Sequence, residues 1–402
     1  MTTSQTSRTV RSYPFGPPDR LELDPRYAWL RTNEPVSRVQ MPYGEEAWLA
    51  TRYADVRTVL GDARFSRAAV ADRDEPRVAP HSQQTGMLAM DPPEHSRLRR
   101  LVAKAFTVRR VEDLRPRAEQ VAEELVDRMV EAGPPADLVD DFAVPLPVIV
   151  ICELLGVPPA DRDRFHVWSE AIVSTTSLSP QQIGGYLDNL GAYIAGLVEQ
   201  RRREPTDADL LGSLVRARDE DDRLSEEEMV ALAGGLLAAG HETTASQIPN
   251  FVYALRTHPD VLEFLRVRPD LVPAAVEELM RWVPLGAAAA FPRYAKEDIE
   301  LSGVTVPAGD PVLAAVHSAN RDGEMFPDPD RIDVTRSPNP HLGFGHGAHH
   351  CLGAPLARVE LQTALAVLLR RLPELRFAVP EGEIPWKTGL FVRGPKHLPV
   401  TW

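Results

Sequence analysis

The sequence predicts a mainly α-helical protein with a small β region, folded as a single domain over residues 1–402. Apolar residues recur at helical spacing over long segments, and short β-branched runs gather towards the two ends of the chain. No repeat, low-complexity tract or Gly/Ser linker separates a second unit. A composition of 43% hydrophobic and 26% charged residues is typical of a globular protein that can bury a large core.

Apolar residues at spacings of three and four predict the helices. We expect them over residues 112–130, 180–203, 225–257, 270–282 and 354–371. Short runs rich in β-branched residues predict the strands. We expect these at residues 36–39, 47–51, 299–301, 304–306 and 312–316.

The segment 225–257 predicts the longest helix. Ser225 can cap its first turn, and Glu228 three residues later completes a capping box. About 33 residues at 1.5 Å each span roughly 50 Å, so we expect this helix to cross the molecule as a central strut. Pro249 is expected to kink it near its far end.

The net charge of −13 argues against nucleic acid and anionic membranes as partners, because phosphate groups repel an acidic protein. The polar N-terminus lacks the apolar core of a signal peptide. The most apolar stretch, residues 142–157, is interrupted by prolines and Glu153 and is shorter than the ~20 residues of a membrane span. Two cysteines in so long a chain fit a reducing compartment, so we expect a cytoplasmic protein, with Cys152 as a buried apolar residue.

The middle of the central helix, LAGGLLAAGHETTAS, is unusual for a buried helix. Small residues between Gly234 and Gly240 would let a flat, bulky group approach the backbone. Glu242, Thr243 and Thr244 then place polar groups where apolar ones are expected. The alternative is close helix packing, with a threonine hydrogen-bonded to a carbonyl of its own helix.

The segment HLGFGHGAHHCLGAPLAR, residues 341–358, combines four histidines and four glycines with Cys351. A zinc site is one explanation, but His349, His350 and Cys351 are consecutive and cannot easily converge on a tetrahedral ion. A cysteine nucleophile with a histidine base is another, although adjacent residues seldom form such a pair. The glycines permit close approach to the thiol, and the helix start after it would stabilise a thiolate. Such a thiolate suits an axial ligand for iron in a flat macrocycle.

Four motifs, in order along nearly the whole chain, resemble those of the cytochrome P-450 family. FGHGAHHCLG (344–353) matches the haem-binding loop FxxGxxxCxG, and AGHETT (239–244) is similar to the oxygen-activation segment. EELMR supplies the ExxR pair as Glu278 and Arg281, and DPPEHSRLRR (91–100) resembles the bacterial segment that binds haem propionates. The resemblance implies the family's triangular helical prism, with haem b (iron protoporphyrin IX) between the central helix and the Cys351 loop.

The resemblance also assigns roles to single residues. Cys351 would be the axial thiolate ligand of the iron. Thr243 would hydrogen-bond dioxygen at the iron, and Glu242 would relay protons from solvent, whereas His241 is expected to have no chemical role. Four basic residues would pair with the haem propionates: His95, Arg99, Arg293 and His349. Further contacts to the haem are expected from Phe344, Gly345, Gly353, Ala239 and Gly240. Phe344 would also limit access to the sulfur.

Glu278 and Arg281 would share one helix face as a structural ion pair. The resemblance implies a further partner from the segment FPDPDRIDVTR, which leaves Arg331 and Arg336 as candidates.

The implied function is that of an oxidoreductase, a haem monooxygenase that inserts one oxygen atom from dioxygen into a bulky apolar natural product by hydroxylation or epoxidation. The chain resembles soluble actinobacterial members that tailor macrolides and other polyketides in antibiotic biosynthesis. LGAAAAFP (285–292) would leave room for such a substrate, or else be a tightly packed extended segment. The loop 66–90 and the glycine-containing region 165–193 would be lids. Oxidative ring closure or coupling, a non-catalytic haem protein, and a zinc or thiol hydrolase are the alternatives.

No reductase or flavin-binding region is evident, so electrons must arrive from a separate carrier. The expected chain is NAD(P)H, a ferredoxin reductase and a ferredoxin. A basic run would attract an acidic ferredoxin, unless it is only a solvated face. Its members are Arg97, Arg99, Arg100, Lys104, Arg109, Arg110, Arg115 and Arg117, joined by Arg358.

Overall fold

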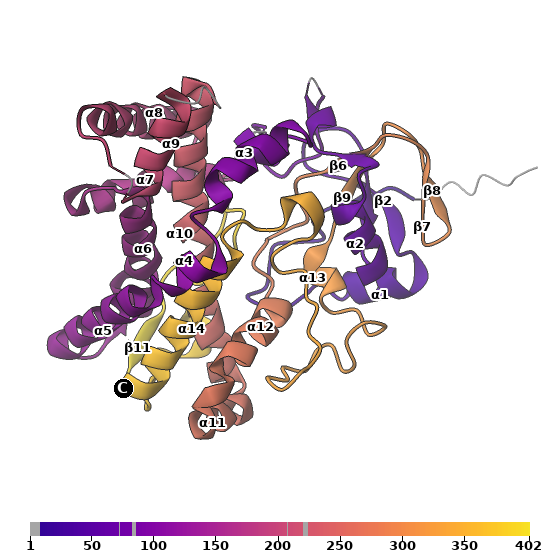
Figure 1. Cartoon of the computed structure of the whole chain (residues 1–402). Coiled ribbons are helices and arrows are strands. Elements are labelled where there is room, and N and C mark those ends of the chain that lie inside the picture. The colour runs from indigo at the N-terminus through magenta and orange to yellow at the C-terminus, as the bar shows by residue number, and fades with distance from the viewer. Residues whose placement is uncertain (1–8, 72, 83–85, 207, 220–223) are drawn as a thin grey trace, which may run out of the picture.

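The computed structural model describes residues 9–71, 73–82, 86–206, 208–219 and 224–402. Helices form the larger part of the molecule, and most strands lie together beside α1, α2 and α13 at the other side (Figure 1). The expectation of a mainly helical protein with a small β region is therefore confirmed. The polar N-terminus up to residue 8, and residues 72 and 83–85 of the expected lid loop, lie outside the described part.

The described helices and strands have the following bounds. The helices are α1 (Arg26–Asn33), α2 (Tyr53–Gly61), α3 (Glu94–Ala103), α4 (Val108–Glu112), α5 (Arg115–Ala132), α6 (Pro145–Leu155), α7 (Arg162–Val173), α8 (Pro180–Arg203), α9 (Leu210–Asp219), α10 (Glu226–Thr257), α11 (Pro259–Val267), α12 (Val272–Trp282), α13 (Val316–Ala319) and α14 (Ala354–Arg371). The strands are β1 (Arg11–Ser12), β2 (Val36–Gln40), β3 (Ala47–Ala50), β4 (Phe65–Ser66), β5 (Ala136–Asp137), β6 (Arg293–Ala295), β7 (Ile299–Leu301), β8 (Val304–Val306), β9 (Pro311–Ala314), β10 (Arg376–Phe377) and β11 (Pro399–Thr401).

The largest sheet combines strands from both ends of the described chain in the order β1-β2-β3-β9-β6-β4. β2 and β3 pair antiparallel with Val36 opposite Ala50, and β3 pairs parallel with β9. β6 and β9 pair antiparallel with Arg293 opposite Val312. The sheet thus holds Arg293 on a buried strand.

The central helix α10 has 32 residues, about 48 Å at 1.5 Å per residue. The predicted capping box is present, because the Ser225 hydroxyl accepts from the Glu228 N–H and the Glu228 carboxylate accepts from the Ser225 N–H. The helix continues through Pro249, and each residue from Thr244 to Leu255 is buried. It packs against α6, α7, α8 and α14, so it forms the centre of the helical core.

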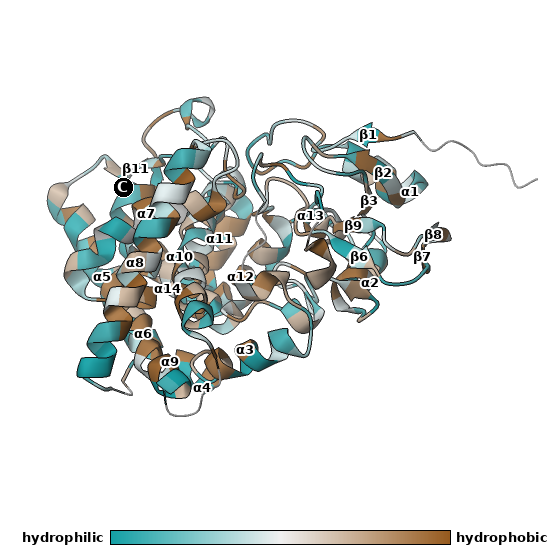
Figure 2. Cartoon of the chain, turned by 90° about the horizontal axis from the view of Figure 1, so that it is seen from above, coloured by the Kyte–Doolittle hydropathy of each residue, from teal (hydrophilic) through white to brown (hydrophobic). Residues whose placement is uncertain are grey.

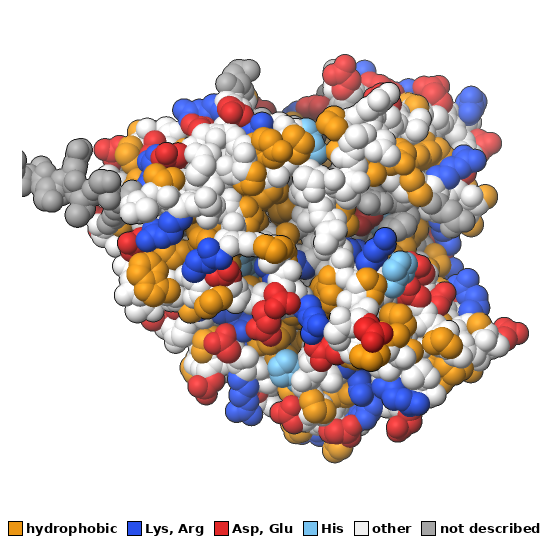
Figure 3. All heavy atoms as spheres, turned by 180° about the vertical axis from the view of Figure 1, so that it is seen from behind, with side chains coloured by type: hydrophobic (Ala, Val, Ile, Leu, Met, Phe, Trp, Pro, Cys, Tyr) orange, Lys and Arg blue, Asp and Glu red, His pale blue; other side chains and the backbone are white. Residues whose placement is uncertain are grey.

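Hydropathy follows this packing. In Figure 2 the brown, apolar colour dominates α6, whereas α3 and α5 carry much of the teal, hydrophilic colour. The apolar stretch that the sequence singled out is thus largely the buried helix α6. Among the described residues, every helix is too short or too polar for a membrane span. Acidic and basic side chains intermingle on the face turned away from Figure 1, with apolar ones between them (Figure 3).

Helix α8 contains four glycines, Gly184, Gly185, Gly191 and Gly196. A Cβ atom placed on any of them would meet no atom of the described residues within 4 Å. Close packing therefore gives no reason for a glycine at these positions.

Candidate functional site

The Cys351 loop is fixed by its own backbone and by α2. The Cys351 N–H donates to the Phe344 carbonyl at 2.8 Å, which closes the loop just before α14 begins. Gly345 and Gly347 adopt left-handed φ angles of 72° and 73°, which favour glycine. A Cβ on Gly347 would lie 2.6 Å from the Cα of Gly61, so the loop also packs closely against the end of α2.

The surroundings of the Cys351 sulfur act on its pKa in opposite directions. The side chain is solvent-accessible, yet the protein around it desolvates the thiol and raises its pKa. The backbone N–H groups of Gly353 and Ala354, with Arg99 and Arg358, lower the pKa. The sequence predicted only this lowering, and desolvation outweighs it. Coordination to a metal ion deprotonates a thiol outright, so these donors suit a metal-bound sulfur.

A cluster of buried and half-buried basic groups lies next to this loop. The ring centroids of His95 on α3 and His349 are 4.3 Å apart, and Arg293 of β6 is 8% exposed. Desolvation and then neighbouring positive charges lower the pKa of His349 to about 3, and desolvation and Arg67 lower that of Arg293 to about 10. His95 Nδ1 is buried and has no hydrogen-bond partner among the described residues. Asp91 supplies one negative charge to these groups, and the two propionates of a haem would balance the remaining positive charge.

The four expected propionate partners lie in one region: besides desolvation, Arg99 and Arg293 lower the pKa of His95, whose ring lies against that of His349. Arg99 lies on α3 with His95, yet its Nη2 donates to the His350 carbonyl at 2.6 Å. This bond ties Arg99 to the Cys351 loop, and its contact to a propionate stays a prediction. A basic residue that the sequence analysis missed, Arg67, lies near the cluster and lowers the pKa of both Arg293 and His349.

On α10, the acid and the alcohol of AGHETT occupy different surroundings. Thr243 is half-buried, and its hydroxyl donates to the Ala239 carbonyl at 3.2 Å, the back-bonding that the sequence offered as an alternative. Glu242 is 4% exposed, and one carboxylate oxygen lies 3.2 Å from Nε2 of His241. His241 is fully buried and its Nδ1 lies 2.8 Å from the Leu237 carbonyl. His241, which was expected to have no chemical role, thus contacts the acid directly.

Two of the small residues of this segment face different environments. Ala239 is exposed on α10. A Cβ on Gly240 would lie 2.6 Å from Cγ1 of Ile151, so a larger residue there would have to displace this side chain of α6.

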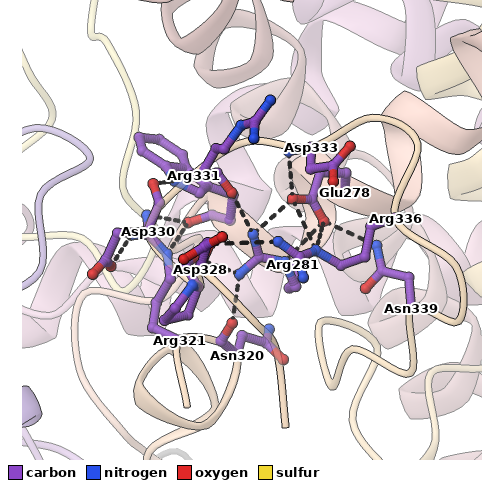
Figure 4. Close-up of polar contacts among 12 residues, drawn as sticks. Glu278, Arg281, Asn320, Arg321, Asp328, Asp330, Arg331, Asp333, Arg336 and Asn339 are labelled. Carbon is purple, nitrogen blue, oxygen red and sulfur yellow. Dashed lines mark hydrogen bonds and ion pairs between the residues drawn. The ribbon is translucent and has the colours of Figure 1, made fainter. Parts of the chain in front are cut away.

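The predicted ion pair of Glu278 and Arg281 is present and fully buried. Arg281 Nε and Nη2 donate to the two Glu278 oxygens at 2.8 and 2.7 Å (Figure 4). Arg336 is the further cation, with its Nε 3.2 Å from Glu278, whereas Arg331 offers only its carbonyl to Arg281 at 2.9 Å. The Asp333 N–H completes the set by donating to Glu278 at 2.8 Å. This network ties α12 to the loop that leads to the Cys351 segment.

A buried acid on α14 had no counterpart in the sequence analysis. Glu360 is fully buried, and desolvation raises its pKa well above the usual range, only partly offset by the Thr244 hydroxyl. Neither carboxyl oxygen has a hydrogen bond of standard geometry with a described residue. Glu360 and Thr244 lie between α14 and α10, the two helices that flank the expected haem site.

Known proteins match this chain closely. The family model described as Cytochrome P-450 matches residues 181–401. The mycinamicin IV hydroxylase/epoxidase of Micromonospora griseorubida is 59% identical over 99% of this chain and 100% of its own length. A structure of a variant of the mixed-function P-450 MycG in complex with mycinamicin V has a TM-score of 0.92 at 59% identity, covering 98% of this chain and 100% of that one. A structure of a cytochrome P-450 with biaryl coupling reactivity has a TM-score of 0.93 at 46% identity, with the same coverage.

Proposed function

The chain belongs to the cytochrome P-450 family and is a haem monooxygenase, and from this premise we propose that it hydroxylates or epoxidises a macrolide or another bulky polyketide. One observation carries the proposal for the site: buried His95 and Arg293 and half-buried His349 form a basic cluster beside the Cys351 loop. The cluster suits the two propionates of haem b, and the loop suits its iron. We further propose that residues 1–402 work as one domain.

Haem supplies the iron at which dioxygen is reduced with two electrons, and Cys351 would bind that iron. The Thr243 hydroxyl, which here donates to the Ala239 carbonyl, would turn to donate a hydrogen bond to dioxygen. Glu242 would hold a proton at the carboxylate oxygen that lies 3.2 Å from His241 Nε2. Both residues would therefore act on the same reactant from one turn of α10.

The substrate class is supported by the relative that is named for mycinamicin IV and is 59% identical to this chain. The alanine-rich segment supports it in part. Ala288 and Ala289 are buried in the protein, so they are packed rather than open to a ligand. Ala287 and Ala290 are half-buried, and their small side chains would leave room beside the haem for a bulky substrate.

Oxidative coupling or ring closure is a second candidate, because a neighbour at 46% identity has biaryl coupling reactivity. The two outcomes differ in the mass of the product. Insertion adds one oxygen atom to the substrate, whereas ring closure or coupling removes two hydrogen atoms without adding oxygen. Mass spectrometry of turnover mixtures made with labelled dioxygen separates them.

We propose a ferredoxin, with its reductase and NAD(P)H, as the electron source. Several arginines of the basic run already form ion pairs: Arg97 with Glu228, Arg115 with Glu112, Arg117 with Glu153 and Arg358 with Glu277. Arg100, Lys104, Arg109 and Arg110 have no ion pair with a described residue. These four are the cations most available to an acidic ferredoxin.

The reduced protein with carbon monoxide tests the iron ligand. Thiolate ligation gives a strongly red-shifted Soret band, and Cys351→Ser should abolish both this band and turnover, because an alcohol donates far less charge to iron. Cys152→Ser is the matched control: burial raises the pKa of Cys152 to about 12, and its substitution should leave the band in place. Full turnover in Cys351→Ser would refute the assignment.

A further inference from the structure

Arg67 is a buried cation that the proposed chemistry does not use. Its side chain is among the largest that are fully enclosed, with 2% exposure, and it forms no ion pair with a described residue. Its Nε donates to the Leu88 carbonyl at 3.1 Å, and its Nη1 donates to the Pro292 carbonyl at 2.5 Å. Burying a guanidinium is costly unless its donors are satisfied, so these two bonds explain how Arg67 is tolerated.

The two carbonyls belong to two segments that the sequence assigns to the substrate site, an expected lid loop and an expected lining segment. Leu88 lies in the short 3₁₀ turn η2 (Gly86–Ala89), which packs against α10 and α3. Pro292 ends the alanine-rich segment and directly precedes Arg293 of the basic cluster. Arg67 therefore joins the expected lid loop to the segment expected to line the substrate.

The alanine-rich segment is held firmly by the rest of the protein. The Ala287 N–H donates to the Phe391 carbonyl at 2.8 Å, and the Ala289 N–H donates to the Tyr13 hydroxyl at 2.6 Å. Phe291 has a left-handed φ of 57°, costly for a residue other than glycine, and its ring packs against that of Phe391 at 5.3 Å. These contacts hold the backbone of the alanine-rich segment in place.

The η2 turn is more exposed than this segment. None of its residues is buried, and Leu88 is 52% exposed. Arg67, in contrast, is anchored at its own backbone, because its N–H donates to Asp91 at 2.8 Å and Ser66 donates to the same carboxylate at 2.5 Å. The guanidinium thus connects the exposed η2 turn to Pro292, while the backbone of Arg67 is itself held by Asp91.

We propose that Arg67 is a positioning residue for specificity: by tying the η2 turn to Pro292, it sets the width of the opening through which bulky ligands enter and leave. This inference rests on the proposed distal substrate site. The effect of Arg67 should depend on ligand size. A small ligand passes the opening whether or not Arg67 holds the turn, whereas a large ligand is retained only while the turn is held.

The test uses haem-loaded Arg67→Gln and Arg67→Lys with two probes that bind haem iron directly, imidazole as the small one and clotrimazole as the bulky one. Arg67→Gln should raise the dissociation rate of clotrimazole by about tenfold or more, as expected when a charge-assisted hydrogen bond is lost. Arg67→Lys keeps the charge but cannot reach both carbonyls in the same way, so it should lie in between. The affinity for imidazole should stay within about twofold of wild type.

Arg73→Gln is the matched control. Arg73 also donates to one backbone carbonyl, that of Gly309 at 2.7 Å, and its guanidinium stacks on Tyr294, but neither residue belongs to the η2 turn. This variant should release clotrimazole at the wild-type rate.

The proposal is overturned if Arg67→Gln releases clotrimazole at the wild-type dissociation rate. It is also overturned if this variant loses haem and imidazole affinity in parallel, because Arg67 would then be part of the haem-binding site. If Arg67→Gln does not fold, Arg67→Lys provides the test. A wild-type dissociation rate of clotrimazole in that variant would also overturn the proposal. Because both probes act on the iron, the result is independent of the natural substrate. A protein that oxidises no polyketide but loses size discrimination in Arg67→Gln would refute the proposed substrate and keep the role of Arg67.

Discussion

Replacing Glu360 by glutamine should remove a loss of stability that the wild type suffers as the pH rises from 5 to 7. Glu360 is enclosed between α14 and α10, and its raised pKa means that the folded protein keeps the carboxyl protonated over a pH range in which the unfolded chain ionises it. Ionisation then lowers the free energy of the unfolded state, whereas the folded state, with its carboxyl protonated, is not stabilised in this way. Glutamine has a similar shape and never ionises, so the variant escapes this penalty.

The sign and size follow from proton linkage. A glutamate in the unfolded chain ionises near pH 4.5, so stability is lost as the pH rises from that value towards the higher pKa of the folded protein. The loss is about 1.4 kcal/mol per pH unit, and at most about 3.4 kcal/mol at pH 7. Between pH 5 and pH 7 the wild type should lose up to about 2.5 kcal/mol more than the variant. Any cost of the buried amide N–H groups is the same at both pH values and cancels.

The assay is urea unfolding of haem-loaded wild type and Glu360→Gln at pH 5 and pH 7. Both proteins carry the same cofactor, so its contribution cancels in the comparison. Glu119→Gln, at an exposed position on α5, is the control and should show the same pH dependence as wild type. If Glu360→Gln also follows wild type at both pH values, the carboxyl is ionised in the folded protein and the reasoning from burial fails.

Three further outcomes follow from the site. Thr243→Ala should retain haem but lower the ratio of product to NAD(P)H consumed by about tenfold or more, with hydrogen peroxide released instead; a wild-type ratio would show that Thr243 only packs. Reversing Arg100 and Lys104 to glutamate should slow reduction by ferredoxin by roughly tenfold at low salt, with unchanged substrate affinity; equal rates would place the carrier elsewhere. Arg281→Met leaves Glu278 without its bidentate partner and should cost about 3–5 kcal/mol in urea unfolding, whereas a loss below 1 kcal/mol would mean that other cations of the network suffice.

Local sequence patterns correctly predicted the helices whose termini are marked by capping residues or charges. The bounds of α8 and α14 agree with those expected, and α10 begins at the predicted cap. α8 has a capping box at Ser179 and three arginines in its last turn, which are strong boundary features. α6 was not expected as a helix, because it is apolar all round and contains prolines, so it has no amphipathic period to detect.

Tertiary contacts account for what the sequence could not predict. β6 has three residues, one of them Arg293, and its pairing with β9 and β4 makes it a strand. The choice of Arg336 over Arg331 depends on the path of an irregular loop. Arg67 lies far from Leu88 and Pro292 in sequence, and its bonds go to backbone carbonyls, which no side-chain motif reveals.

The four glycines of α8 have a consequence for local unfolding. Each costs about 1 kcal/mol of helix propensity relative to alanine, and no close contact with a described residue requires them. Together they lower the free energy of opening α8 by about 3–4 kcal/mol. Amide hydrogens in α8 should then exchange with solvent by sub-global opening, while those of α10 and α14 exchange only when the whole core unfolds. We therefore expect α8 to behave as a separate cooperative unit, which opens while the haem site stays closed.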